Sequence, residues 1–111
     1  MTEPLAMTPP DQDWERMRDC RVVVPDHVVF RGLAEETILL NIETGHYHGL
    51  DRVGGRFFEV IRECEGLGAA SRQLAAEYGQ PLAQIEADLL RFCVDLESRG
   101  LIELERDAAG A

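Results

Sequence analysis

The spacing of the apolar residues in this 111-residue chain changes at Asp51. Before Asp51, residues 22–24, 27–30 and 37–42 are β-branched or apolar and are separated by turn residues, a pattern typical of strands. After it, apolar residues recur at intervals of three and four, which is typical of helices with one buried side. The change in period therefore predicts an α+β fold with a single core, in which helices cover one face of a sheet.

The third strand of the predicted antiparallel sheet runs from His46 to Leu50 and lies at an edge of that sheet. It follows the second strand after only residues 43–45, where Gly45 supplies the positive φ that a tight hairpin requires. Residues 101–104 are a candidate for a short closing strand.

Three helices are predicted within residues 51–66, 71–79 and 81–100, with Asp51 and Ser71 as N-caps of the first two and a glycine at the end of each. The predicted core stripe of the longest helix consists of Leu82, Ile85, Leu89, Phe92, Cys93 and Leu96. A three-stranded antiparallel sheet followed by three helices resembles a winged helix-turn-helix. This topology alone leaves both DNA and protein open as partners.

One domain is expected from residue 21 to residue 106, between a flexible acidic tail at 1–20 and a short flexible tail at 107–111. Within the first tail, Trp14 and Met17 are three residues apart. They are predicted to form a short amphipathic turn that packs on the domain's own surface, with docking on a partner as the alternative.

Charge and hydropathy exclude several classes of protein. The net charge is −10 and the chain contains no lysine, which disfavours binding to nucleic acid. No apolar run approaches the roughly 18 to 20 residues of a membrane span, and the N-terminus is acidic rather than basic. We therefore expect no membrane partner and a cytoplasmic location.

The three cysteines are expected to be reduced thiols, because their number is odd and their spacing is wide. Cys64 and Cys93 fall within helical apolar stripes, where a free cysteine packs as a small hydrophobe. Cys20 lies in the predicted tail. Since a cysteine hydrolase requires an accessible thiol beside a positioned histidine, the sequence does not favour an enzyme.

A metal site was considered at His46 and His48, which lie on one face of a strand, together with Cys20 or His27. No tight ligand pair such as CxxC or HExxH accompanies them. The sequence therefore predicts no metal and no other cofactor.

Residues 28–31 and 39–51 resemble the PqqD-like family, also called the precursor-peptide recognition element, through the run Leu-Asn-x-x-x-Gly-x-Tyr-x-Gly-Leu. Residues 53–58 and the sequence Leu-x-x-x-Gly-Leu at 96–101 continue the resemblance, which covers about residues 22–104. One departure is a phenylalanine at position 58, where many members carry tryptophan.

The resemblance implies a protein that binds the leader segment of a ribosomally synthesised, post-translationally modified peptide. It implies delivery of that leader to a partner enzyme such as a radical SAM enzyme, a peptidase or a cyclase, and no turnover by the chain itself. The leader would be added as a strand to the open edge of the third strand.

In relatives the leader lies between the third strand and the third helix, so the resemblance assigns peptide binding to His46, Tyr47, His48 and Gly49. Gly49 has two interpretations. It permits close approach of a peptide backbone or a side chain, or it marks a bulge near the end of the strand.

Two flanks of the third helix compete for the leader. Leu90 and Val94 are predicted to point away from the core stripe and are apolar, whereas Asp88, Arg91 and Asp95 form a charged strip on the other side. The first pair offers apolar anchoring and the second set fixes register. The alternative use of Leu90 and Val94 is as an exposed aliphatic pair or a homodimer contact.

The alternative function is a winged-helix transcriptional regulator, in which the helix at 81–100 enters a major groove. That helix carries more acidic than basic residues, which would repel phosphates. The charged residues concerned are Arg91 and Arg99 against Glu86, Asp88, Asp95 and Glu97.

Overall fold

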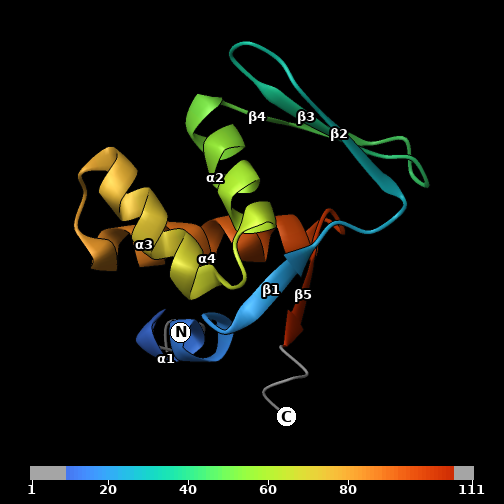
Figure 1. Ribbon diagram of the computed structural model, residues 1–111. Coiled ribbons are helices and arrows are strands. Elements are labelled where there is room, and N and C mark those ends of the chain that lie inside the picture. Colours follow the sequence, from blue (N-terminus) through green and yellow to red (C-terminus); the bar gives the residue numbers. More distant parts are fainter. Residues whose placement is uncertain (1–9, 107–111) are drawn as a thin grey trace, which may run out of the picture.

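The computed structural model describes residues 10–106 and confirms the α+β fold, with a three-stranded antiparallel sheet followed by helices (Figure 1). The elements in chain order are α1 (Pro10–Met17), β1 (Cys20–Val23), β2 (Val28–Gly32), β3 (Thr37–Asn41), β4 (Tyr47–Leu50), α2 (Arg52–Glu63), α3 (Leu67–Tyr78), α4 (Leu82–Ser98) and β5 (Glu103–Arg106).

The strands form two separate antiparallel sheets. The larger sheet has the order β2-β3-β4, and the smaller one pairs β1 with β5. The predicted closing strand is present, but it begins at Glu103 rather than at residue 101, because Leu101 and Ile102 are buried in the core.

The inner face of the larger sheet packs against α2. Phe30 of β2 and His48 of β4 are the cross-strand neighbours of the fully buried Leu39, so these three side chains share that face. Helix α2 approaches closely at Gly55, where an added Cβ would lie 2.6 Å from the Oγ1 of Thr37. Only glycine therefore fits at this crossing without a shift of the neighbouring chain.

Helix α2 begins as predicted, because the carboxylate of Asp51 accepts a hydrogen bond of 2.8 Å from the backbone N–H of Gly54. Helix α3 does not begin as predicted. It starts at Leu67, one turn before Ser71, and the buried hydroxyl of Ser71 donates to the carbonyl of Gly68 at 2.8 Å. The helix therefore begins four residues before Ser71, the predicted N-cap, and its first residue, Leu67, is buried.

An ion pair ties α2 to α3. The guanidinium of Arg56 donates to both carboxylate oxygens of Glu77, at 2.8 and 2.5 Å, and its Nη1 donates to Glu59 at 2.8 Å. The hydrogen bonds from Arg56 and from Gln73 lower the pKa of Glu77 to about 2. The contact between the two helices is therefore charged at every pH near neutrality.

The N-terminal helix corrects the predicted start of the domain. Helix α1 occupies residues 10–17 of the segment predicted as a flexible tail, and Cys20 already belongs to β1. Trp14 is only 7% exposed within the core cluster, which confirms that it packs on the domain itself. The remaining tail residues of the prediction, 1–9 and 107–111, lie outside the described part of the chain.

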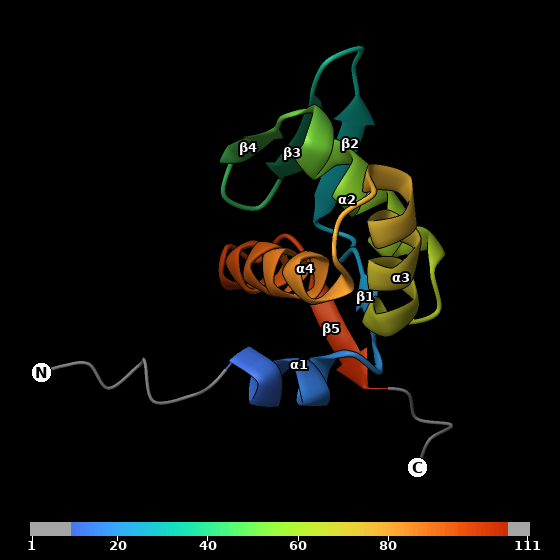
Figure 2. The same ribbon diagram turned by 90° about the vertical axis from the view of Figure 1, so that its left-hand side faces the viewer.

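Helix α4 lies between the larger sheet and α1 in both views (Figures 1 and 2). The predicted stripe is buried at Ile85, Leu89, Cys93 and Leu96, while Phe92 is partly buried. Leu82, the first residue of the helix, is exposed.

Leu90 was expected to lie outside the core, and this expectation is wrong. Its side chain is 7% exposed and belongs to the core cluster that includes Trp14. Helix α1, which the sequence analysis predicted as part of a flexible tail, contacts α4 and contributes Trp14 to the same core cluster. Val94, one turn later, remains 49% exposed.

The cysteines are free thiols, as expected. Cys20 and Cys93 are buried and Cys64 is partly buried. Burial raises the pKa of Cys93 to about 12, so this thiol stays protonated at neutral pH.

We predict that Trp14→Ala lowers the free energy of unfolding by about 3 kcal/mol, because a large buried side chain is removed from the core. Urea denaturation followed by circular dichroism measures the change. Glu15→Ala, at an exposed neighbouring position, serves as the control and should change stability by less than about 0.5 kcal/mol. If both variants are as stable as the wild type, α1 is not part of the folded unit.

A second pair of variants tests the flank of α4 that carries Leu90 and Val94. Leu90→Ala should lower the free energy of unfolding by about 2 to 4 kcal/mol, since a buried leucine leaves a cavity. Val94→Ala should cost less than about 1 kcal/mol, since its side chain is already half exposed. Equal losses for the two variants, measured by the same denaturation, would contradict the assignment of Leu90 to the core.

Candidate functional site

The turn between β3 and β4 is built around Asn41. Its buried side-chain Oδ1 accepts hydrogen bonds from the backbone N–H groups of Glu43 and Thr44, at 2.9 and 3.3 Å. Gly45 has a φ of +79°, as the sequence predicts, and its N–H donates to the carbonyl of Asn41 at 2.8 Å. This turn fixes β4 beside β3.

The backbone groups of β4 alternate between two directions. The N–H of Asn41 donates to the carbonyl of His46 at 2.9 Å, which sets the phase of the ladder. In an antiparallel pair every second residue bonds to the neighbouring strand, so His48 and Leu50 bond to β3. The N–H and C=O groups of Tyr47 and Gly49 consequently point away from β3.

Within residues 10–106, the outer edge of β4 has no strand partner. The unpaired backbone groups of Tyr47 and Gly49 lie along that edge. The sequence analysis predicted this edge position for the third strand. Such an edge is a template for an additional strand from another chain.

Side chains of β4 also alternate between the two faces of the sheet. His48 shares the inner face with Leu39, whereas Tyr47 lies on the outer face and is 75% exposed. The pairing of Ile38 with Gly49 is continuous, so Gly49 does not mark a bulge. A Cβ at Gly49 would lie 3.1 Å from the Oε2 of Glu36, the end of a flexible side chain.

The charged flank of α4 carries two ion pairs. Asp88 pairs with Arg91, and the Nε of Arg99 donates to the two carboxylate oxygens of Asp95 at 3.1 and 3.2 Å. At 100° per residue, Asp88, Asp95 and Arg99 lie on one flank, and Leu90 and Val94 lie on the opposite flank. The buried Leu90 belongs to the second of these flanks.

A cleft of about 210 Å³ lies between the β3–β4 hairpin and the C-terminal end of α4. It is lined by Asn41, Thr44, His46, Tyr47, His48, Arg99 and Leu101. The presence of Arg99 shows that the charged flank of α4, rather than the Leu90 flank, faces the hairpin. The cleft adjoins the open edge of β4.

The structure brings together three of the predicted site residues, His46, Tyr47 and His48, in this cleft, with Gly49 next along the same edge. It adds Arg99, which the sequence analysis treated only as a charge. The available signal was its position four residues after Asp95, which places both side chains on one flank.

Three further residues that the sequence analysis did not select also line the cleft. Asn41 and Thr44 come from the turn, and Leu101 follows the end of α4. They were missed because a turn residue and a residue after a helix reach the same cleft only in the folded chain. The predicted residues of α4 do not line it: Asp88, Leu90, Arg91, Val94 and Asp95.

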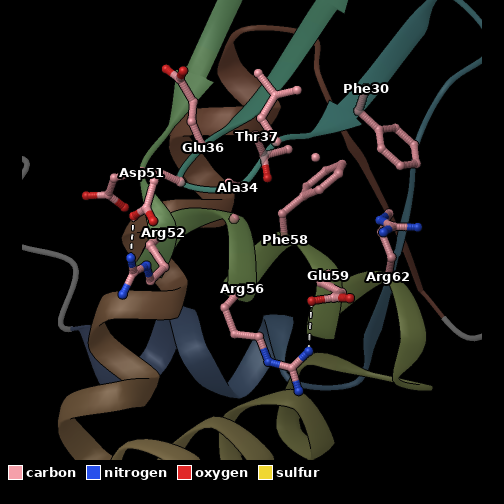
Figure 3. Close-up of a pocket in the computed structure, with 14 residues that line it drawn as sticks. Phe30, Ala34, Glu36, Thr37, Asp51, Arg52, Arg56, Phe58, Glu59 and Arg62 are labelled. Atoms are coloured by element: carbon pink, nitrogen blue, oxygen red, sulfur yellow. Dashed lines mark hydrogen bonds and ion pairs between the residues drawn. The ribbon is translucent and has the colours of Figure 1, made fainter.

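A second pocket, of about 460 Å³, lies between the β2–β3 connection and α2. Figure 3 shows Arg56 joined to Glu59, and Arg62 beside Phe30. The guanidinium carbon of Arg62 lies 4.4 Å from the centroid of the Phe30 ring, in a cation–π contact. This pocket contains no residue of β4 or α4.

Two further observations concern the described residues alone. Residues 10–106 contain no group of three or more histidine, cysteine, aspartate or glutamate side chains placed to hold a metal ion. None of the helices in that range is long and apolar enough to cross a membrane.

Comparison with known proteins places this geometry in a family. The solved structure described as TbiB1 in complex with the TbiA(beta) leader peptide is similar to this chain, with 32% sequence identity and a TM-score of 0.68. The match covers 73% of this chain and 94% of the TbiB1 chain. The search of curated proteins found no match.

The family model described as coenzyme PQQ synthesis protein D (PqqD) matches residues 36–102, more than half of the chain. This range contains β3, β4 and the three helices that follow them. The resemblance noted in the sequence is thereby confirmed, and the chain belongs to the PqqD family.

Proposed function

We propose that this chain binds the leader segment of a ribosomally synthesised, post-translationally modified precursor peptide by strand addition to β4. The observation that carries the proposal is the open edge of β4 beside a cleft formed with α4. The similarity to TbiB1, whose structure was solved with a leader peptide, supports the same use of the fold.

Strand addition explains how one domain recognises an extended peptide. The outward-pointing backbone groups of Tyr47 and Gly49 would bond to the leader's main chain, whatever its sequence. Specificity would come from leader side chains that point toward α4. We propose that the charged flank formed by Asp88, Arg91 and Asp95 guides the leader, because Arg99, which lines the cleft, lies on the same flank.

Leu90 and Val94 are left out of the proposed site. Leu90 is buried in the core, and Val94 lies on the same flank of α4, opposite Asp88 and Asp95. The proposed peptide-binding residues are therefore His46, Tyr47, His48, Gly49, Asp88, Arg91 and Asp95, together with Arg99.

The role we propose is delivery rather than catalysis. A bound leader would be presented to a maturation enzyme, such as a radical SAM enzyme, a peptidase or a cyclase, that acts on the rest of the precursor. Because precursor peptides of this class are made on ribosomes, the proposal places the complex in the cytoplasm.

DNA binding is the less favoured function. Arg91 and Arg99 are the basic side chains that α4 and its C-cap would offer to a phosphate backbone. Each is paired with an aspartate on the same helix, and the chain carries a net charge of −10. No observation favours this function.

The test is fluorescence polarisation with a labelled synthetic peptide that carries the leader of the precursor gene adjoining this one. We predict that Gly49→Pro weakens binding at least tenfold, because proline removes the outward N–H of residue 49. The ladder with β3 should survive, since it uses His48 and Leu50 rather than residue 49.

Gly49→Ala is the matched control. It retains the N–H, and its Cβ requires only a small movement of the Glu36 side chain, so affinity should stay within about threefold of the wild type. Circular dichroism confirms that both variants fold. Unchanged affinity in a folded Gly49→Pro variant would show that the leader binds elsewhere.

A further inference from the structure

The cleft between the β3–β4 hairpin and the end of α4 has a chemistry of its own. Resting on the proposed function, we infer that it receives an acidic side chain of the bound leader. This names the kind of leader residue that the site selects, beyond the strand addition that any extended peptide can make.

The polar side chains that line the cleft are hydrogen-bond donors or can act as donors. Those nearest the open edge of β4 are the imidazoles of His46 and His48, and Arg99 closes the opposite side. None of the seven lining residues is acidic, although the chain has 21 acidic residues against 11 arginines. An acceptor, and above all a carboxylate, complements such a lining.

Arg99 keeps donors available for a guest. Asp95 engages only its Nε, at 3.1 and 3.2 Å, and the two terminal amino groups of the guanidinium make no hydrogen bond to residues 10–106. Both side chains of this pair are about half exposed, and exposed pairs of this kind are weak. Asp95 therefore orients Arg99 without using up its capacity to bind a second carboxylate.

The end of α4 does not repel an anion as strongly as a free helix C-terminus would. The N–H groups of Gly100 and Leu101 donate to the carbonyls of Glu97 and Leu96, both at 3.0 Å. The carbonyl of Gly100 is in contact with the Nε2 of His27 at 3.1 Å. These contacts occupy carbonyl groups that would otherwise face an acidic guest.

The register of strand addition carries a leader side chain to this cleft. Leader residues that bond to Tyr47 and Gly49 lie opposite them, and their side chains share the outer face of the sheet. The leader residue opposite His48 has its side chain on the inner face of the sheet. The leader residue opposite His46 has its side chain on the same face. An acidic residue at either of these inner positions would point into the cleft.

The experiment uses the full-length chain and the labelled leader peptide of the preceding section. Arg99→Gln is compared with Arg72→Gln, which removes an equal charge from an exposed position on α3 that does not line the cleft. Each aspartate or glutamate of the leader is replaced in turn by asparagine or glutamine, and affinities are combined in double-mutant cycles.

We expect Arg99→Gln to weaken leader binding by about tenfold, and Arg72→Gln by less than about twofold. Replacement of one particular acidic leader residue by its amide should weaken binding to the wild-type protein by the same factor. That amide peptide should bind the wild-type protein and the Arg99→Gln variant equally well. That non-additivity identifies the acid that occupies the cleft.

Two results would overturn the inference while leaving the proposed function intact. Either Arg99→Gln binds the leader as tightly as Arg72→Gln does, or no acidic leader residue is coupled to Arg99. A leader that fails to bind the wild-type protein at all would instead overturn the proposed function, and the acidic subsite would fall with it.

Discussion

The position of β4 at the end of a three-stranded sheet is the constraint on which the site depends. Asn41 and Gly45 fold the chain back so that β4 bonds to β3 along one edge only. On the inner face, the buried side chains of Leu39 and Leu50 hold the sheet against α2. The hydrophobic core thus supports an edge strand whose remaining backbone groups are left for another chain.

Helix α4 connects this edge to the rest of the fold. One flank contributes Leu90 to the core, while the opposite flank carries Asp95, which holds Arg99 at the cleft beside the hairpin. Because the two flanks differ in this way, the same helix stabilises the domain and forms a wall of the cleft. A substitution on one flank is therefore expected to affect stability, and a substitution on the other to affect recognition.

The sequence predicted what depends on local spacing and on single special residues. The change of period at Asp51, the N-cap at that residue and the positive φ at Gly45 are all local properties, and each is present in the structure. The edge position of β4 also followed from sequence, because short loops leave few ways to order three antiparallel strands.

What the sequence did not predict depends on contacts between segments far apart in the chain. Helix α1 is short and polar apart from Trp14 and Met17, so its docking is a property of the folded core rather than of its own pattern. Burial of Leu90, in the same core cluster as Trp14, is likewise a property of the folded core. The cleft also escaped prediction in part, because it joins a turn near residue 44 to Arg99.

Amide hydrogen exchange followed by NMR, with and without the leader peptide, tests the open edge most directly. In the free protein, the amides of His48 and Leu50 should exchange slowly, and those of Tyr47 and Gly49 rapidly. Saturation with the leader should slow exchange at Tyr47 and Gly49 while His48 and Leu50 stay protected. If a saturating leader leaves exchange at Tyr47 and Gly49 as rapid as before, no strand is added to β4 and the account is wrong.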